Sequence, residues 1–314
     1  IVAACGLPIP KTSSRAITSP AGTADTMETL APVDLDIAAM RRVVEREGGC
    51  IVWGGAVDLS PADDVLIRIE RSLDLDSNAQ LVASVLSKKI SAGATHVVID
   101  IPVGPTAKLR SESAATRLSD QLIDVGKRLA LPIAVECTDG SQPVGRGIGP
   151  GLEARDVLSV LKCEASAPAD LRERASRLAG RLLEFGGRVS VGEGYSRALD
   201  VLASGEAWRK FEAICEAQGG MRAPPVATHV HDIESSIGGT VVTIDNRRLA
   251  KAAKLAGAPN GPAAGVEMHV RLGARVGKGE PLYSVHAETP GELAYALHFI
   301  EAQPDIVAVE EGGI

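Results

Sequence analysis

The chain has 314 residues, enough for about two domains and for a sizeable core without disulfides or a structural metal. Its formal net charge is −7 and its isoelectric point is about 5.5, which argues against general binding to nucleic acids or to a membrane surface. These values still leave room for a local cationic pocket that takes a small anion. Aromatic residues make up only 3% of the chain, so the core must be built from Val, Leu, Ile and Ala.

The cysteines and the first residues indicate the setting of the protein. Five cysteines form no CxxC pair, and three of them lie in or beside apolar runs, so we expect reduced thiols in a cytoplasmic protein. No apolar stretch approaches the length of a transmembrane helix, and no signal peptide is visible. The chain opens with the apolar segment Ile1–Gly6 and no Met, so we expect a fragment whose N-terminal part is missing.

Helical and strand patterns alternate over the first two thirds of the chain. Ile37, Met40, Val43 and Val44 lie on one helical stripe that ends at Gly48. We expect helices at 34–47, 77–91, 113–129, 152–161, 168–185 and 195–217, and strands at 50–53, 96–101 and 131–136. The strands are continuous apolar runs, as expected when both faces of a parallel sheet are covered. The alternation predicts a doubly wound, mainly parallel α/β sheet.

The pattern changes after Pro224-Pro225, which we interpret as a linker. Short β-type runs separated by Gly and Pro follow, including 239–244 and 281–285. We expect a small β-rich domain there, and we interpret 273–285 as a tight hairpin.

Residues 11–25 form the first candidate site. Ser and Thr side chains, Arg15 and a glycine lie close together in this segment. Hydroxyls and backbone N–H groups can surround a phosphate or a ribose without adding formal charge, and a guanidinium offers a planar fork. The alternative is an ordinary Ser/Thr-rich loop, which composition alone favours.

The second candidate combines Arg68 with a helix that carries Ser84 and Lys88. Ser84 and Lys88 are four residues apart and therefore share one helix face, while Asp76 precedes the helix. A cation, a hydroxyl and a carboxylate on one edge suit the hydrogen-bonding rim of a nucleobase. The alternative is that Asp76 caps the helix and that Lys88 belongs to a solvated face.

The third candidate is the loop 102–108, which contains Gly104 and Lys108 and follows a buried strand. Ligands of open α/β sheets bind beyond the carboxyl ends of the strands, so Lys108 is well placed. The segment 138–140 follows the next strand in the same way, although it also reads as a simple turn.

Three other motifs are interpreted as structural. The glycines of 145–151 do not have the GxGxxG spacing of a dinucleotide loop, so we expect this segment to begin a helix. His229 and His231 lack companion ligands with metal-site spacing and are interpreted as linker or strand residues. Lys278 lies between two glycines and is interpreted as a turn residue.

Several segments in chain order resemble the thymidine phosphorylase and AMP phosphorylase family. The most specific is Ser-Ser-Arg-Ala-Ile-Thr-Ser-Pro-Ala-Gly-Thr-Ala-Asp-Thr-Met-Glu, at residues 13–28. The match continues through segments 59–64, 76–89, 96–104 and 277–282. It covers essentially the whole chain.

The resemblance implies a protein of three lobes with the active site in a cleft. Residues 1–59 and 93–223 would form the central α/β phosphate-binding domain, and 60–92 the returning segment of a helical lobe. Residues 224–314 would form a C-terminal α+β domain. The remainder of the helical lobe and a glycine-containing phosphate loop would lie upstream of Ile1, so the fragment alone is expected to be nearly inactive.

The resemblance also implies roles for individual residues. Ser13 and Thr23 match phosphate-contacting positions, and Asp76 matches a proton donor of the AMP branch. Arg68, Ser84 and Lys88 match the residues that hold the base, and Lys88 would also stabilise the leaving group. The nucleotide-binding positions of the AMP branch are matched by Ser14, Arg15, Ala16, Ile17, Thr18, Ser19, Thr23 and Lys108.

The implied activity is reversible phosphorolysis of a pyrimidine nucleoside, such as thymidine, to the free base and (deoxy)ribose 1-phosphate. Ser19 stands where thymidine enzymes usually carry a histidine, which keeps an AMP-type phosphorylase as an alternative. A phosphoribosyl-transfer or ligand-binding relative without phosphorolysis is a second alternative. The expected ligands are a nucleoside or nucleotide and inorganic phosphate, with no metal or organic cofactor, and the resemblance suggests a cytoplasmic homo-oligomer.

Overall fold

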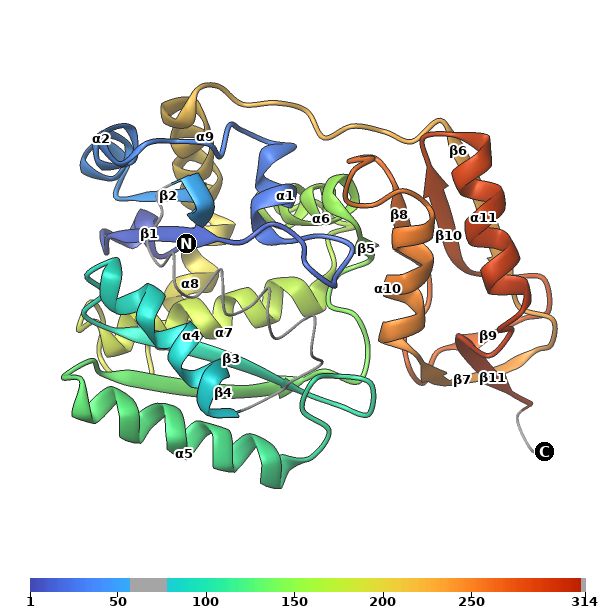
Figure 1. The fold of residues 1–314 in the computed structure, drawn as a ribbon, viewed down its shortest axis with the longest axis horizontal. Coiled ribbons are helices and arrows are strands. Elements are labelled where there is room, and N and C mark those ends of the chain that lie inside the picture. The colour runs from blue at the N-terminus through green and yellow to red at the C-terminus, as the bar shows by residue number, and fades with distance from the viewer. Residues whose placement is uncertain (57–77, 312–314) are drawn as a thin grey trace.

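The fold is known from a computed structural model that describes residues 1–56 and 78–311. Figure 1 shows a larger N-terminal part of strands and helices and a smaller C-terminal part at its side, joined by an extended segment near residues 219–228. The N-terminal part contains strands β1 (Ile9–Ser13), β2 (Gly49–Trp53), β3 (Val97–Val103), β4 (Ile133–Asp139) and β5 (Gly147–Ile148). Its helices are α1 (Thr23–Glu28), α2 (Ile37–Glu47), α4 (Asn78–Ser91), α5 (Glu112–Arg128), α6 (Pro150–Leu161), α7 (Ala169–Phe185), α8 (Gly194–Ala203) and α9 (Glu206–Gln218), with short 3-10 turns η1 (Ala3–Cys5) and η2 (Gly54–Ala56).

Two pairs of parallel strands organise the N-terminal part. β1 pairs with β2, and β3 pairs with β4 in register from Val97 opposite Ile133 to Val103 opposite Asp139. Helices connect the strands of each pair, so the predicted α/β class is confirmed. Among the described residues no hydrogen bonds join β1 to β3. A cavity of about 480 Å³ lies there, lined by Ile9 and Lys11 of β1 and by Val98 and Asp100 of β3.

The ends of the helices follow the sequence signals. Asp36 caps α2 by accepting the amide of Ala39 at 2.7 Å, and Gly48 ends the helix in the left-handed region with φ of 74°. The glycine-rich segment 145–151 does lead into a helix, since Pro150 begins α6. Asp156 of α6 accepts the amides of Arg146 at 2.5 Å and Gly147 at 2.7 Å, which fixes the turn before that helix.

The single helix predicted for 195–217 is wrong. The structure has α8 and α9 instead, separated at Ser204 and Gly205. Gly205 has φ of 71°, a left-handed conformation that glycine adopts without strain. Apolar residues continue at helical spacing on both sides of the glycine, and this continuity concealed the break.

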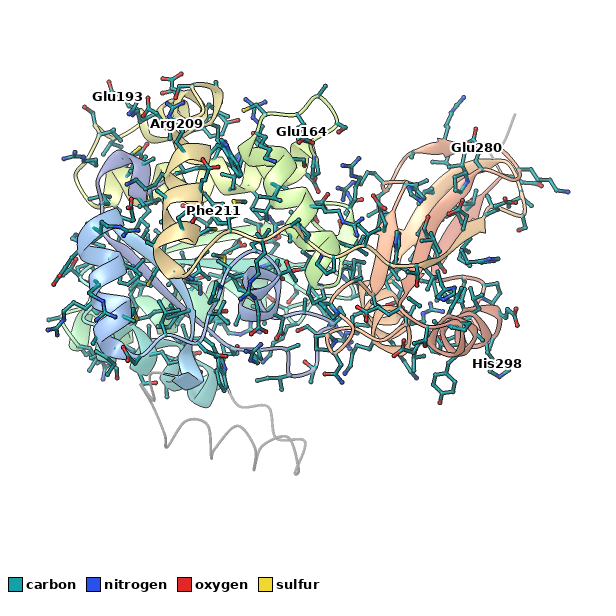
Figure 2. The ribbon with its side chains drawn as sticks, turned by 90° about the horizontal axis from the view of Figure 1, so that it is seen from above. Glu164, Glu193, Arg209, Phe211, Glu280 and His298 are labelled. Carbon is teal, nitrogen blue, oxygen red and sulfur yellow. The ribbon has the colours of Figure 1, made fainter. Side chains whose placement is uncertain are left out.

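The side chains of α9 divide between the surface and the interior. Arg209 is exposed at the rim, as is Glu193 just before α8, while Phe211 lies farther inside (Figure 2). Phe211 packs against a buried cluster that includes Met27 and Leu30 from the segment around α1. Helix α9 therefore ties the end of the N-terminal part to the helix that follows β1.

Gln218, the last residue of α9, holds the edge of β2. Its side-chain oxygen accepts the amide of Ile51 at 2.8 Å, and its nitrogen donates to the carbonyls of Ile51 at 2.9 Å and Pro32 at 2.8 Å. Only 5% of Gln218 is exposed, so water cannot replace these bonds.

We predict that Gln218→Ala lowers the free energy of unfolding by about 2–4 kcal/mol, because it leaves buried backbone groups without partners. Urea unfolding followed by circular dichroism measures this change. Gln121→Ala on the exposed face of α5 is the matched control and should change stability by less than about 0.5 kcal/mol. Equal losses of unfolding free energy in the two variants would show that the hydrogen bonds of Gln218 do not stabilise the edge of β2.

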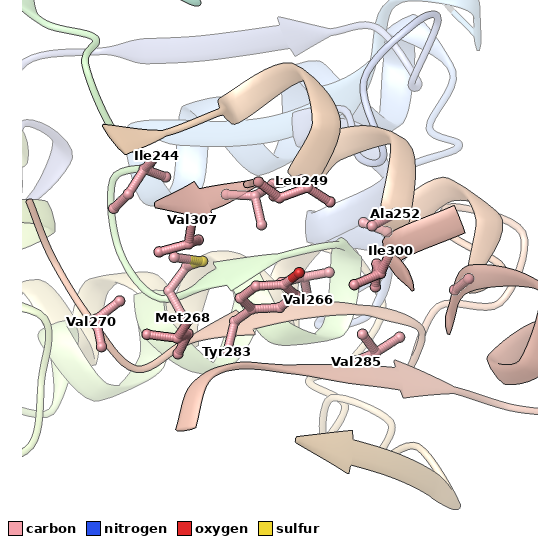
Figure 3. Close-up of a cluster of buried hydrophobic side chains, with 14 of the residues drawn as sticks. Ile244, Leu249, Ala252, Val266, Met268, Val270, Tyr283, Val285, Ile300 and Val307 are labelled. Atoms are coloured by element: carbon pink, nitrogen blue, oxygen red, sulfur yellow. The ribbon is translucent and has the colours of Figure 1, made fainter. Parts of the chain in front are cut away.

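The C-terminal part is an α+β unit with its own core. It contains β6 (His229–Glu234), β7 (Gly239–Ile244), α10 (Asn246–Leu255), β8 (Gly265–Met268), β9 (Arg275–Val276), β10 (Pro281–Ala287), α11 (Pro290–Glu301) and β11 (Val307–Glu310). Alternate residues of β10 such as Tyr283 and Val285 turn toward α10 and α11, where they meet Leu249 and Ile300 (Figure 3). Burial raises the pKa of the Tyr283 hydroxyl above its ordinary value.

The hairpin predicted for 273–285 is wrong. β9 pairs with β7, whereas β10 pairs with β8 and β6 in a different sheet. The turn is present, because the side chain of Glu280 accepts the amide of Gly277 at 2.8 Å, but the chain changes sheets there. Turn residues predict a reversal of direction and do not predict which strands pair.

Candidate active site

The loop between β1 and α1, residues 14–22, carries most of the predicted ligand residues. Ser14, Thr18, Ser19 and Thr23 are exposed, and Ser13 at the end of β1 is partly exposed. The hydroxyl of Ser19 donates to the carbonyl of Ala21 at 2.8 Å, which gives the loop a local turn. The hydroxyl groups predicted to surround a phosphate therefore lie on one accessible loop and, for Ser13 and Thr23, at its two ends.

Ile17 lies at the tip of this loop and is 37% exposed, while Ala16 is partly buried at its start. Lys254 of α10 donates to the carbonyl of Thr18 at 3.3 Å, so the C-terminal part touches the loop. The loop thus lies between the two parts of the molecule (Figure 1).

Arg15 is engaged by carboxylates of its own chain. Its guanidinium donates to Glu28 at 2.5 and 3.0 Å and to Asp25 at 3.3 Å, and it lies over the ring of Trp53 at 4.9 Å. The hydrogen bonds from Arg15 lower the pKa of the Glu28 carboxyl, since they favour its charged form. Arg15 thus lies in the predicted loop, and its guanidinium forms two hydrogen bonds with Glu28. Its expected contact with an anion stays a prediction.

The charges of three lysines, one on β1 and two on α4, influence one another. Leu86 of α4 is buried against α5 and β3, which fixes the orientation of the helix. The pKa of Lys11 on β1 is lowered, first by the protein packed around it and then by the positive charges of Lys89 and Lys88. The end of the Lys11 side chain still reaches solvent. The charge of Lys88 therefore reaches Lys11, on the strand that ends at Ser13.

Lys11 and Lys89 were not predicted as functional. Burial lowers the pKa of Lys89, and the charge of Lys88 lowers it further. The sequence does carry a signal, because Lys11 interrupts a strand that is otherwise apolar or hydroxylated. A local concentration of ammonium groups attracts small anions in spite of the negative net charge of the chain.

The structure describes some of the remaining predicted residues and not others. Arg68 and Asp76 lie outside the described residues, as does most of the predicted returning segment 60–92. Ser84 lies on α4, one helical turn before Lys88. Lys108 is exposed on the loop that follows β3.

The loop with Lys108 also meets the C-terminal part. Arg247 of α10 donates to the carbonyls of Thr106 at 3.1 Å and Ala107 at 3.3 Å. The neighbouring strands β3 and β4 are also joined by side chains, since Thr138 donates to Asp100 at 2.6 Å. Hydrogen bonds from Ser141 lower the pKa of Asp139. Thr138 and Asp139 are the last residues of β4, so the strand is longer than predicted and only Gly140 of segment 138–140 lies beyond it. A role of this segment in ligand binding stays a prediction.

Glu153 is a partly buried carboxyl that sequence analysis did not single out. It accepts the hydroxyl of Thr26 at 3.0 Å and the amide of Gly149 at 3.2 Å. Burial raises its pKa to about 7, with smaller contributions from the charges of Asp156 and Asp25. A glutamate in the first turn of a helix reads as an ordinary surface residue, so no local pattern indicates this environment.

Two further observations concern the described residues. In residues 1–56 and 78–311, no three His, Cys, Asp or Glu side chains come together in a group that could hold a metal ion. The helices in the same ranges include none that is long and apolar enough to cross a membrane.

Comparison with known proteins gives the chain its family. Residues 1–208 match the model described as "Glycosyl transferase family, a/b domain", and residues 240–306 match "Pyrimidine nucleoside phosphorylase C-terminal domain". The chain is 64% identical over 311 residues to "Putative thymidine phosphorylase 1" of Acidovorax sp. (strain JS42), covering 99% of this chain and 61% of that protein. It is 62% identical over 311 residues to "Putative thymidine phosphorylase" of Hahella chejuensis (strain KCTC 2396), covering 99% of this chain and 62% of the relative.

The chain thus spans about three fifths of the length of these relatives. The family resemblance predicted from the loop at residues 13–28 is confirmed by both domain matches. With a single domain model matching two thirds of its residues, this chain belongs to the glycosyl transferase family that has this a/b domain.

Proposed function

We propose that the whole protein that carries this chain is a nucleoside phosphorylase of the thymidine phosphorylase type, a pentosyltransferase. It would convert a pyrimidine nucleoside and phosphate into the free base and (deoxy)ribose 1-phosphate, reversibly. The observation that carries the proposal is the hydroxyl-rich loop 14–22 at the end of β1, with the hydroxyls of Ser13 and Thr23 at its two ends. The names of the relatives support the same reaction.

The proposed mechanism begins with attack of phosphate on the anomeric carbon as the C–N bond breaks. Ser13 and Thr23 are suited to orient phosphate, because their hydroxyls can donate to its oxygens. The leaving base gains negative charge, which Lys88 and Arg68 would stabilise while Ser84 aligns the ring. Asp76 would give a proton to the base if it is held in its neutral form, and would orient the base otherwise.

Phosphate is the nucleophile, and the leaving base needs only charge stabilisation and a proton. We therefore propose that the reaction requires neither a metal ion nor an organic cofactor. Water competes with phosphate as a nucleophile, so closure of the parts around the substrate would favour phosphorolysis over hydrolysis.

A nucleoside 5′-monophosphate is the alternative substrate. Ser19 occupies the position where thymidine enzymes usually carry histidine, as noted above. The basic group of Lys11, Lys88 and Lys89 would also suit a substrate with an additional phosphate. These two observations favour testing AMP beside thymidine.

A substrate panel tests the proposal. Thymidine, uridine and AMP are incubated with the whole protein, with and without inorganic phosphate, and free base and sugar 1-phosphate are separated by chromatography. We expect base release from at least one substrate that depends on phosphate. Release without phosphate, or binding without any cleavage, would favour a non-phosphorolytic relative instead.

The cytoplasm is the compartment that we propose for the protein. All five cysteines are free, and burial raises the pKa of Cys50 to about 11 and that of Cys215 to about 12. Free thiols without disulfides suit a reducing compartment. We also propose a homo-oligomer that acts on small molecules, which light scattering of the purified protein would test.

A further inference from the structure

The loop 14–22 is closed by one side chain, that of Asp25 on α1. One oxygen of this carboxylate accepts the amide of Ala16 at 2.6 Å and the amide of Gly22 at 2.9 Å. The other oxygen accepts the guanidinium of Arg15 at 3.3 Å. A single carboxylate thus bonds to both ends of the loop that carries the predicted phosphate and nucleotide residues.

Asp25 is turned away from solvent. Only 9% of the residue is exposed, and its carboxylate accepts hydrogen bonds from Arg15, Ala16 and Gly22. A carboxylate would also repel a phosphate at close range. Asp25 therefore acts on a ligand through the loop and does not contact it.

The two ends of the loop also touch directly. A Cβ atom placed on Gly22 would lie 2.4 Å from the carbonyl oxygen of Ser14 and 2.7 Å from the carbonyl carbon of Arg15. The absence of a side chain at Gly22 lets the backbone of the returning chain lie against that of the departing chain. Asp25 and Gly22 thus fix the same junction by different means.

We propose that Asp25 is a positioning residue for the reaction: its carboxylate holds residues 14–22 in the conformation that binds phosphate and the sugar. The inference rests on the proposed function and adds a residue to it. Loops that are ordered before binding lose less conformational entropy when the ligand arrives, so loss of the carboxylate weakens binding.

The test compares three variants of the whole protein. Asp25→Ala removes all three acceptor contacts. Asp25→Asn keeps one oxygen that can accept the amides of Ala16 and Gly22, and turns an amide nitrogen toward Arg15. Asp34→Ala is the matched control, since Asp34 also forms an ion pair with Arg15, at 3.6 Å, but is largely exposed.

We expect Asp25→Ala to raise KM for inorganic phosphate by about tenfold or more, while kcat changes by less than about threefold. Asp25→Asn should recover most of this loss, and Asp34→Ala should match the unmodified protein. Deuterium exchange of the amides in residues 14–22 should accelerate in Asp25→Ala only. Equal effects of Asp25→Ala and Asp34→Ala would overturn the inference, because they would reduce it to charge around Arg15.

A second variant covers the case in which Asp25→Ala does not fold. Gly22→Ala pushes the same loop ends apart without changing a charge, and it should likewise raise KM for phosphate with little change in kcat. Normal KM values in the folded variants would overturn the role of Asp25 while leaving the proposed function intact.

If the unmodified protein itself shows no phosphate-dependent cleavage, the proposed function fails. In that case, calorimetric titration with inorganic phosphate tests the role of Asp25 without any catalytic readout. A phosphate-binding constant in the variants equal to that of the unmodified protein would overturn the inference.

Discussion

Replacing Lys88 by alanine is expected to lower kcat/KM for phosphorolysis by about two to three orders of magnitude. In the proposed reaction the leaving base carries negative charge in the transition state, and an ammonium group fixed on a helix would stabilise that charge without reorganisation. Lys88 lies on α4, whose orientation is set by the burial of Val82 and Leu86 against α5. The loss should fall mainly on kcat, because the uncharged base in the ground state gains less from the cation.

Steady-state kinetics of the whole protein with thymidine and AMP measures this effect. Lys127→Ala at the exposed end of α5 is the matched control, since it removes an equal charge from the last turn of a neighbouring helix. It should leave kcat/KM within about twofold, as expected of a solvated surface charge. If the two variants behave alike, Lys88 does not act on the leaving group.

Lys88→Arg separates charge from geometry. Arginine keeps the positive charge but presents a wide planar fork in place of a compact ammonium. We expect kcat to remain well below that of the unmodified protein. Full activity in Lys88→Arg would reduce the role of Lys88 to its contribution to the local potential.

The regular elements of the N-terminal part could be predicted from local sequence. The apolar stripe of α2, its Asp36 cap and its Gly48 stop are all signals that act within a few residues. The long helix at 195–217 and the hairpin at 273–285 could not be predicted in the same way. Gly205 ends one helix within a continuous apolar pattern, and the partners of β10 are set by packing with distant strands.

The residues of the candidate site also fall into those that local sequence predicts and those that it does not. The hydroxyls of loop 14–22 and the spacing of Ser84 and Lys88 are visible in the sequence. Asp25 and Glu153 were missed, because their roles depend on contacts between segments. Thr26 and Glu153 are 127 residues apart, and no periodic pattern relates positions at that distance.

The contribution of Glu153 to the stability of the protein is expected to fall as pH rises from about 5 to 7. Burial raises the pKa of this carboxyl from its ordinary 4.5 to about 7. Between these two values the folded chain keeps a proton that the unfolded chain has released, so the free energy of unfolding decreases with pH. Above the folded pKa the loss is complete, and a shift of this size corresponds to about 3 kcal/mol.

Glu153→Gln removes this dependence, because the amide stays neutral at every pH. Its oxygen can accept the amide of Gly149, and its nitrogen can donate to the hydroxyl of Thr26, which in turn donates to the carbonyl of Gly22 at 3.3 Å. The variant should match the unmodified protein near pH 5 and exceed its stability by about 2–3 kcal/mol at pH 8. Urea unfolding at a series of pH values measures the difference, in which the contributions of other groups cancel. Glu45→Gln on the exposed face of α2 is the control, and a stability gap for Glu153→Gln that stays constant with pH would show that Glu153 is ionised throughout.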